Sequence, residues 1–501
     1  MRASAVAGTT GGQFPVRSNS LFSLDKICET ATASPGKLAL VADGREHSYR
    51  GLYRAILAAR RRLAPRAQPG RVAAVLIYSI ADAWPVVLGL RSLGCTTVAI
   101  DRGADMAHLA RLDVALVVIR KGEMRWAEAL SFAPPGAEVV EIEADVAIDG
   151  EAAGALQGAP VTALVGGHVL LTSGTTGVYK CVLLSPEREQ LTAAMGALDW
   201  VVNVLQFGLW TAIGYSTAVA AWCTGSAVIV WQGPDLHRSF DYPRITHAFA
   251  TPAFLARVLA GLEGEAPRHQ NLRLTVFGGP LSASLARQAK ARLAPMVLTA
   301  FGSSEVGGWA LTEIAGPQDL KWHKIAAGWS VEVVDETGRP LPPGELGEVR
   351  VRTPESSSGG YWGDPESTAR FFRDGWFHPG DLGVLDGEGR IAFHGRITNV
   401  LNIRGDKRAA EPFEQALAER LGIESVCVMS ETGADHEEEL HVVIETARPI
   451  PAADLAEAAR ATLHGFAQAR FHFVETMPRN HMGKVLRGAL RAQLLARKPA
   501  S

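Results

Sequence analysis

The sequence predicts an α/β protein in which a large N-terminal domain is followed by a small C-terminal domain. Three observations indicate this arrangement. Apolar strands alternate with helical stretches in the first third of the chain, as in parallel sheets that helices cover on both faces. Two pairs of short strands joined by turns follow, and the last hundred residues form a helix and strand succession of their own. With 501 residues, 47% of them hydrophobic, the chain is long enough for two packed cores.

The first third supplies the elements of the parallel sheets. We expect a buried strand over residues 72–77, a helix over 81–93, and further strands over 97–100 and 112–119. The uncharged segment 200–234 has the length of a membrane span, but polar residues and glycines interrupt it. We therefore expect a buried helix and strand there and no membrane span.

The middle and the end of the chain change character. Strands over 331–334 and 347–351, and a hairpin over 382–394, predict a β-hairpin or barrel-like subdomain of the large domain. The C-terminal elements are expected to be helices over 409–421, 453–463 and 485–494, with strands over 426–429 and 440–444. We place the boundary after Arg396, which gives domains 1–396 and 397–501. The second is a small, mobile α+β domain that could close over a site.

Charge and cysteine content exclude several classes of function. The formal net charge is −2, which provides no basic field for nucleic acid. Five widely spaced cysteines without a C-x-x-C motif argue against a disulfide framework or a structural zinc site, and favour a reducing compartment. The first twenty residues lack the apolar stretch of a signal peptide, so we expect a cytoplasmic protein.

The strongest local motif is a glycine- and hydroxyl-rich loop that follows an apolar strand. Glycines allow backbone N–H groups to face an anion, hydroxyls add donors, and a lysine adds a positive charge. The alternative is a polar hairpin turn. The residues in question are Thr172, Ser173, Gly174, Thr175, Thr176, Gly177 and Lys180.

This loop resembles the phosphate loop of the AMP-forming adenylating enzymes, which include acyl-CoA synthetases, peptide-synthetase adenylation domains and luciferases. Other matches follow in the order of that family over nearly the whole chain. They are Thr251-Pro252, Gly278-Gly279-Pro280, Phe301-Gly302-Ser303-Ser304-Glu305, Gly344 to Glu348, Tyr361-Trp362, Gly380-Asp381, Gly395-Arg396, Gly405, and Gly483-Lys484 with Arg487. Ten weak matches in one order identify the chain as a member of this family, closest in kind to an acid–CoA ligase.

The resemblance assigns nucleotide-binding roles that the chemistry of the residues supports. A glutamate oxygen is a hard ligand suited to Mg2+, so Glu305 is expected to bind it together with Thr176. Ser304 is expected to contact the α-phosphate, Phe301 and Gly302 to lie at adenine with Gly278, Gly279 and Pro280, and Asp381 to accept the ribose hydroxyls. Arg396 is expected to hold ribose or phosphate. The alternatives are that Glu305 begins a helix and that Asp381 shapes a turn.

Lys484 is expected to carry adenylate formation. It stands in a glycine-bearing loop before the last predicted helix, where an ammonium can neutralise the incoming carboxylate and the oxygen that it joins to phosphorus. On its own, a Gly-Lys pair at such a place is more often a solvated surface lysine.

Several positions depart from the family pattern. Phe301 replaces a tyrosine, and Tyr179 and Cys181 replace a proline and a glycine beside the phosphate loop. Thr398 and Asn399 replace the charged pair at the hinge. These changes bear on the rates of closure and rotation more than on the fold.

The substrate is indicated less directly. Phe207 and Gly208 occupy the place of the Phe-Asp pair that holds an α-amino group in peptide synthetases, and Thr251 belongs to the stretch that lines the acyl pocket. No carboxylate lies within residues 200–234 to pair with a substrate ammonium. We therefore expect an aliphatic or aromatic acid rather than an amino acid.

The resemblance also suggests how a thiol acceptor would bind. Gly405 matches the glycine past which pantetheine threads, and Lys407 and Arg408 could pair with the phosphates of coenzyme A. The alternative is a solvated basic hairpin.

The leading hypothesis is an acid–CoA ligase that uses ATP, Mg2+ and coenzyme A on a small carboxylic acid. A second is a stand-alone adenylation enzyme that loads the pantetheine of an acyl carrier protein. A third is a nucleotide-binding protein with little activity. The oligomeric state is left open.

Overall fold

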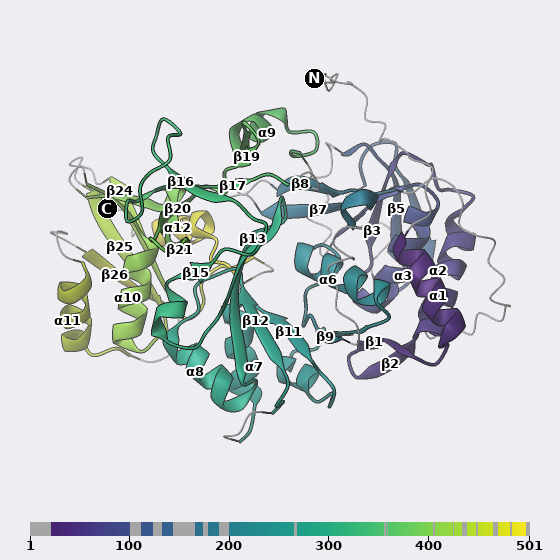
Figure 1. Ribbon diagram of the computed structural model, residues 1–501, viewed down its shortest axis with the longest axis horizontal. Coiled ribbons are helices and arrows are strands. Elements are labelled where there is room, and N and C mark those ends of the chain that lie inside the picture. Colours follow the sequence, from purple (N-terminus) through teal and green to yellow (C-terminus); the bar gives the residue numbers. More distant parts are fainter. Residues whose placement is uncertain are drawn as a thin grey trace. The chain divides into compact units, whose positions relative to one another are not determined.

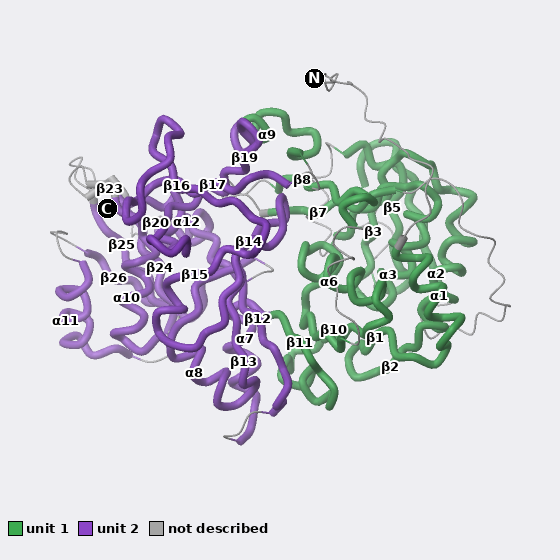
Figure 2. The backbone as a smooth tube through the Cα atoms, viewed as in Figure 1, with its two compact units in different colours: residues 1–249, 355–369 green, residues 250–354, 370–501 purple. Residues whose placement is uncertain are grey.

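The computed structural model consists of two compact units, drawn in Figures 1 and 2. Unit 1 contains residues 1–249 and 355–369, and unit 2 contains residues 250–354 and 370–501. The residues that the structure describes are 22–100, 112–123, 133–143, 166–173, 179–189, 200–264, 268–354, 357, 359–403, 406–423, 425–432, 438–446, 449–463, 469–480 and 483–496. The proposed domain boundary after Arg396 falls inside unit 2 and remains a prediction.

Unit 1 contains a six-stranded sheet in the order β6-β5-β3-β4-β7-β8. Neighbouring strands are parallel except β7 and β8, which form an antiparallel hairpin. The three strands β3, β4 and β5 are buried along almost their whole length, as expected for strands covered on both faces, and they confirm the first three predicted strands. The bounds are β3 (Val72–Leu76), β4 (Thr96–Ala99), β5 (Val114–Arg120), β6 (Glu138–Ile142), β7 (His168–Ser173) and β8 (Tyr179–Leu184).

A second group of strands in unit 1 has the order β11-β9-β10-β1-β2. All its neighbours are parallel except the β1–β2 hairpin. The bounds are β1 (Leu38–Ala42), β2 (Arg45–Ser48), β9 (Val201–Asn203), β10 (Ala227–Val230) and β11 (His247–Ala250).

The helices of unit 1 begin at hydroxyl caps. Ser48 caps α2 (Tyr49–Leu63), Ser79 caps α3 (Ile80–Ser92) and Thr211 caps α6 (Ala212–Cys223), each by accepting a hydrogen bond from a first-turn backbone N–H. The other helical segments that begin in unit 1 are α1 (Phe22–Ala33), η3 (Leu236–Phe240) and α9 (Pro365–Phe371).

The uncharged segment 200–234 folds as predicted. It supplies β9, the mostly buried helix α6, and the buried strand β10. Among the helices that the structure describes, none has the length and apolar run needed to cross a membrane.

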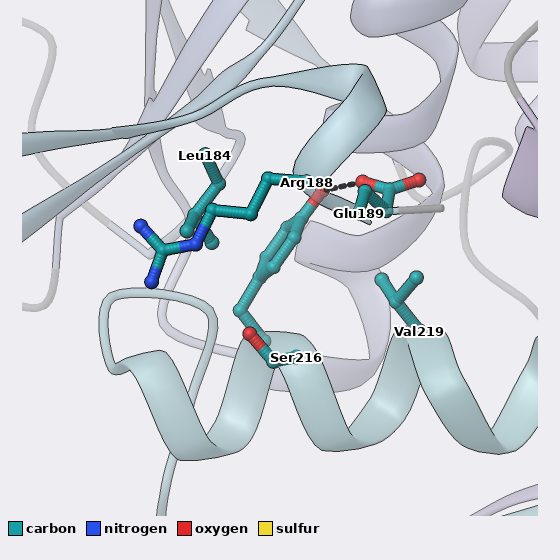
Figure 3. A pocket seen from close by; sticks show the side chains of 6 residues that line it. Leu184, Arg188, Glu189, Ser216 and Val219 are labelled. Carbon is teal, nitrogen blue, oxygen red and sulfur yellow. Dashed lines mark hydrogen bonds between the residues drawn. The ribbon is translucent and has the colours of Figure 1, made fainter. Parts of the chain in front are cut away.

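A buried polar network joins α3, β7 and α6 in the core of unit 1. The guanidinium of Arg91 donates to the Glu189 carboxylate and to the Tyr215 hydroxyl, and that hydroxyl donates to the same carboxylate at 3.0 Å. The ring of His168 stacks on Tyr215 with centroids 4.0 Å apart, and burial lowers the pKa of His168 to about 3. Figure 3 shows the small pocket beside this network, which none of the predicted site residues lines.

Unit 2 opens with two helices and three strands. β12 and β13 are parallel, and β13 turns back into the antiparallel strand β14 through residues 304–306. The bounds are α7 (Pro252–Gly261), β12 (Arg273–Phe277), α8 (Ala283–Arg292), β13 (Met296–Ser303), β14 (Gly307–Glu313) and η4 (Pro317–Leu320).

The predicted hairpin subdomain is a sheet in the order β15-β21-β20-β17-β19-β18, with β16 paired to β17. Both predicted hairpins are confirmed. The carboxylates of Asp335 and Asp386 close the two turns by accepting hydrogen bonds from backbone N–H groups of the residues that follow. These local bonds explain why the sequence predicts the turns. The bounds are β15 (His323–Lys324), β16 (Val331–Val334), β17 (Gly347–Arg352), β18 (Phe372–Arg373), β19 (Trp376–Phe377), β20 (Asp381–Leu385) and β21 (Arg390–Arg396).

The end of the chain has apolar clusters of its own within unit 2. One lies between α10, α11 and the sheet β24-β25-β26, and a second lies between that sheet and α12. The predicted helices and strands are present, although the first helix begins at Glu411 because Ala409 ends a strand. The bounds are η5 (Ile397–Asn399), β22 (Val400–Ile403), β23 (Asp406–Ala409), α10 (Glu411–Leu421), β24 (Val426–Thr432), β25 (Glu438–Glu445), α11 (Ala452–Thr462), β26 (Ala469–Val474) and α12 (Arg487–Ala496).

Candidate active site

Asp381 and Arg396 lie opposite each other at the ends of β20 and β21 in unit 2. Their antiparallel register pairs the two residues directly, and Arg396 Nε lies 3.1 Å from Asp381 Oδ1. Arg396 also donates to the carbonyl of Pro379, beside the left-handed turn residue Gly380. These two contacts fix the direction of the Arg396 side chain.

The terminal loop that carries Lys484 is held by its own hydrogen bonds. Arg479 donates to the Gly483 carbonyl at 2.9 Å and to a Glu445 oxygen at 2.7 Å, while the Asn480 side chain accepts from the Lys484 N–H at 3.0 Å. Gly483 has a φ of +79°, which glycine adopts without strain. These hydrogen bonds fix the backbone at Gly483 and Lys484.

Lys484 belongs to a cluster of charges. The residues that act on its ammonium are Arg396, Asp381 and Glu305, all in unit 2. The pKa of Lys484 is lowered first by desolvation of its ammonium and then by the positive charge of Arg396. The carboxylates of Asp381 and Glu305 act in the opposite direction. Solvent still reaches the side chain, so Lys484 is exposed in a polar setting rather than sealed in an apolar one.

The same cluster explains the pKa of Asp381. Limited access to water raises this pKa, the neighbouring charges of Arg396 and Lys484 lower it, and the carboxylate of Glu411 raises it further. About a quarter of the Asp381 side chain remains exposed, so a ligand could reach it.

Glu305 and Ser304 stand in the turn between β13 and β14. Glu305 is buried, while Ser304 is partly exposed. Phe301 lies three residues before Ser304. Its ring stacks on that of Phe393 with centroids 3.9 Å apart, and its centroid lies 4.6 Å from that of the His323 ring. One use of the Phe301 ring is therefore to fill the core, and its expected contact with adenine remains a prediction.

Gly278, from the stretch predicted to contact adenine, and Gly483, which precedes Lys484, both lie at the start of α7. Thr251 caps this helix by accepting the Phe254 N–H at 3.3 Å. A Cβ on Gly278 would lie 3.4 Å from the Thr251 side chain, and one on Gly483 would lie 3.0 Å from Ala253. The structure thereby brings Thr251, Gly278 and Gly483 together, while the roles predicted for these residues remain predictions. Gly279 lies beside Pro252, and Pro280 and Gly302 are exposed in the same unit.

The phosphate loop belongs to unit 1, and its two ends are described. Thr172 and Lys180 face each other across the β7–β8 ladder. The Lys180 ammonium lies 4.7 Å from the centre of the Tyr361 ring, and the Trp362 N–H donates to the Cys181 carbonyl at 2.8 Å. The predicted roles of the Ser173 side chain and of Gly174, Thr175, Thr176 and Gly177 concern parts outside the described residues.

The predicted acyl residues Phe207 and Gly208 also lie in unit 1. Phe207 is buried, and a Cβ on Gly208 would lie 2.4 Å from the Trp210 ring, which would have to shift to admit a side chain. Of the predicted thiol site, Arg408 is exposed, and Gly405 and the Lys407 side chain lie outside the described residues. These assignments remain predictions.

The residues present fit Mg2+ carried by nucleotide phosphates. Within the described part of the chain, no group of three or more His, Cys, Asp or Glu side chains could hold a metal ion by itself. Mg2+ commonly binds one or two protein carboxylates together with substrate phosphates and water. Glu305 is such a single carboxylate.

Sequence reasoning missed the residues that support the site. Neither Asn399 nor Glu411 was singled out for a contact, although they hydrogen-bond at 2.5 Å. The replacement of a charged hinge residue by asparagine was the available signal. Likewise, Arg479 and Asn480 looked like ordinary loop residues before their bonds to the Lys484 loop were known.

Comparison with known proteins decides the family. The sequence profile described as "AMP-binding enzyme" matches residues 27–362, about two thirds of the chain.

The chain belongs to the AMP-binding enzyme family.

This AMP-binding enzyme is similar to several characterised proteins. It is 31% identical over 357 residues to the fatty acid–[acyl-carrier-protein] ligase ScoC of Streptomyces coeruleorubidus, over 64% of this chain and 66% of that protein. It is 28% identical over 352 residues to the indoleacetate–CoA ligase of Aromatoleum aromaticum, over 66% of this chain and 67% of that protein. Other curated relatives are matched over as little as 51% of their length.

Solved structures share the fold of this AMP-binding enzyme. The ATP-bound MatB of Rhodopseudomonas palustris superposes with a TM-score of 0.78 at 23% identity, over 95% of this chain and 99% of MatB. The α/β architecture predicted from the sequence is therefore confirmed over almost the whole chain.

Proposed function

We propose that this AMP-binding enzyme activates a carboxylic acid with ATP and then transfers the acyl group to a thiol. In the first step, a carboxylate oxygen bonds to the α-phosphorus of ATP while the bond to the pyrophosphate oxygen breaks. In the second step, the thiol sulfur bonds to the acyl carbon, AMP leaves, and the thiol proton passes to solvent. The observation that carries the proposal is the cluster of Lys484, Arg396, Asp381 and Glu305 in unit 2.

Each member of this cluster suits one part of a nucleotide. The carboxylate of Asp381 can accept hydrogen bonds from the ribose hydroxyls, while Arg396, fixed by its ion pair, can contact ribose or phosphate. Lys484 supplies a positive charge where the attacking carboxylate and the α-phosphate would both be negative. Glu305 would bind Mg2+, which neutralises the phosphate oxygens when it arrives with ATP.

The acid is proposed to be aliphatic or aromatic. The segment 200–234 contains no carboxylate, and burying a substrate ammonium without a partner charge is costly. The names of the relatives point the same way, since ScoC is named for fatty acids and another relative for indoleacetate.

Coenzyme A is the proposed acceptor, with a carrier protein as the second candidate. Indoleacetate, 4-hydroxybutyrate and 3-hydroxybenzoate ligases among the relatives are named for CoA. The carrier-protein alternative is favoured by ScoC, which has the highest identity of these and is named for an acyl carrier protein.

We place the enzyme in the cytoplasm. The five cysteines, all within the described part of the chain, form no disulfide. That agrees with a reducing compartment.

The test of the first step is a pyrophosphate-release screen across fatty, aryl and amino acids. Release with a fatty or aryl acid supports the proposal. Binding of ATP or AMP without release for any acid would instead identify a nucleotide-binding protein with little activity.

The acceptor is tested by adding CoA or a pantetheine-bearing carrier protein to the adenylate. We expect Gly405→Leu to preserve pyrophosphate release and to abolish thioester formation, because a side chain would block the pantetheine path. Alanine at both Lys407 and Arg408 should raise the KM for CoA more than the KM for pantetheine, which lacks the nucleotide phosphates. A parent enzyme that ignores CoA but loads the carrier would replace the first acceptor with the second.

A further inference from the structure

Glu411, the first residue of α10, is bonded to the hinge segment that follows Arg396. Its Oε1 accepts a hydrogen bond from Asn399 Nδ2 at 2.5 Å. The backbone is tied at the same place, because the Ala410 N–H donates to the Asn399 carbonyl at 3.0 Å. The β22–β23 ladder lies between these contacts and fixes their register. Asn399 and Glu411 thus form a closed connection across a short hairpin.

The same carboxylate faces the strand that carries Arg396. A Cβ on Gly395 would lie 2.0 Å from Glu411 Oε2, so only glycine permits this approach. Among the described residues, that oxygen is buried and accepts no hydrogen bond. Glu411 is therefore pressed against the residue immediately before Arg396.

Glu411 also reaches the helix that follows Lys484. Arg487 Nη2 lies 3.7 Å from Glu411 Oε1 and makes a two-pronged pair with Glu414 at 2.7 and 2.8 Å. Arg487 begins α12, three residues after Lys484. One carboxylate consequently contacts both segments that carry the positive charges of the site.

The negative charge of Glu411 also acts on Asp381. It is one of the groups that raise the pKa of Asp381, beside the opposing effects of Arg396 and Lys484. A shift of Glu411 would therefore alter the field at the nucleotide-binding carboxylate as well as the position of the arginine.

We infer that Glu411 is a positioning residue for adenylate formation, acting through Asn399 and Arg487 to hold Arg396 and Lys484 around Asp381. This inference rests on the proposed function. It explains why a neutral amide stands at position 399: an aspartate there would set two carboxylates within hydrogen-bond distance, whereas asparagine donates a proton.

A purely structural role predicts a different outcome. A glutamate in the first turn of a helix stabilises that helix through its dipole, and losing it would reduce folded protein and both half-reactions alike. A positioning role predicts a loss confined to adenylate formation, the half-reaction that needs Arg396 and Lys484 together. It also predicts that activity returns when the hydrogen bond is rebuilt with donor and acceptor exchanged.

The experiment is an amide exchange. Asn399→Asp, Glu411→Gln and the double variant are compared with the parent, since the double variant can rebuild the bond with donor and acceptor exchanged between the two positions. Gln415→Glu is the matched control, because it creates the same amide-to-carboxylate change beside Glu419 on an exposed face of α10. Single-turnover pyrophosphate release and thioester formation from supplied acyl-adenylate are measured separately, together with Tm.

We expect Asn399→Asp to slow pyrophosphate release about 10- to 100-fold, the range for losing a hydrogen bond to a charged group. Thioester formation and the control should stay within about twofold of the parent, and the double variant should recover most of the loss. Equal losses in both half-reactions, or no recovery in the double variant, would overturn the inference.

The affinity for a non-reactive ATP analogue, measured by calorimetry without acid on the parent, the two single variants and the double variant, separates the two proposals. It should weaken in Asn399→Asp and recover in the double variant, because Arg396 and Asp381 would shift together. A parent that binds the analogue but releases no pyrophosphate would refute the proposed function, and the affinity cycle alone would then decide the role of Glu411.

Discussion

Replacing Lys484 with alanine removes one charge from the cluster without removing packing. The side chain is exposed, and its loop is held by the backbone and by Arg479 and Asn480. Exposed substitutions of this kind usually change stability by less than about 0.5 kcal/mol, so the variant should fold with an unchanged Tm. Any large loss of activity would then belong to the chemistry.

The size of that loss follows from what the ammonium faces. Among the described residues that act on Lys484, two carboxylates outnumber one arginine, so these groups alone carry a net negative charge once the ammonium is removed. Removing one preorganised group that stabilises transition-state charge typically costs about 2.7–4 kcal/mol, or 10²–10³ in rate. We expect adenylate formation to fall by about that factor, and thioester formation from supplied acyl-adenylate to be retained.

The pH profile gives a second reading of the same residue. Because the pKa of Lys484 is lowered from 10.5, the ammonium loses its proton at a lower pH than a free lysine does. The rate of adenylate formation in the parent should therefore decline as pH rises through the alkaline range below 10.5, and this decline should be absent from the residual activity of Lys484→Ala.

The assay is pyrophosphate release in a single turnover, with Lys324→Ala as the control. Lys324 is an exposed lysine of β15 in the same unit. Near-normal pyrophosphate release in Lys484→Ala, or an equal loss in the control, would refute the reasoning.

Three further predictions concern Asp381, Arg91 and Tyr361. Asp381→Ala should weaken ATP and AMP binding while the protein stays folded, and the loss should shrink for 2′,3′-dideoxy ATP; equal losses would show that Asp381 only shapes its turn. Arg91→Met should lower the free energy of unfolding by about 3–5 kcal/mol, because it leaves the Glu189 carboxylate buried without its arginine partner, whereas Arg66→Met, in an exposed pair, should lower it by about 1 kcal/mol or less; both are measured by urea unfolding. Tyr361→Leu should raise the KM for ATP about 2- to 30-fold, because it removes the aromatic ring beside Lys180. Tyr361→Phe keeps the ring and should leave the KM for ATP unchanged, so equal KM values for the two variants would exclude a cation–π contribution.

Local chemistry made much of the fold predictable. The hairpins at Asp335 and Asp386 were readable because each aspartate closes its turn within four residues. The buried strands of unit 1 were readable because strands covered on both faces consist of nearly continuous runs of apolar residues. In both cases the deciding interactions lie within the segment itself.

Contacts between distant segments were not predictable in the same way. Arg91 stands in the last turn of a helix, where a basic residue ordinarily faces water, and nothing nearby shows that Glu189, 98 residues later, will pair with it. Phe301 was assigned to adenine from its position in a motif, but its stacking partner Phe393 lies on another strand. A single sequence carries no periodic signal for such pairs.

The candidate site shows the same division. Asp381, Arg396, Glu305 and Lys484 were named from motif and residue chemistry, and they interact in unit 2. The groups that hold them could not be named, because their roles depend on which hydrogen bonds the folded loops make.

The β7–β8 hairpin has a consequence for changing the length of the phosphate loop. Thr172 pairs with Lys180 and Ser173 with Tyr179, so the ladder, rather than the residues at its tip, decides which face of the hairpin the lysine occupies. Side chains of a strand alternate between faces, and a slip of one residue reverses every one of them. An insertion at the tip would leave Lys180 in place as long as the pairing of β8 with β7 is kept. A single deletion within β8 would turn the lysine to the opposite face and bring Tyr179 or Cys181 to its position. The position of Lys180 should therefore be insensitive to the length of the loop but sensitive to the length of the strand that follows it.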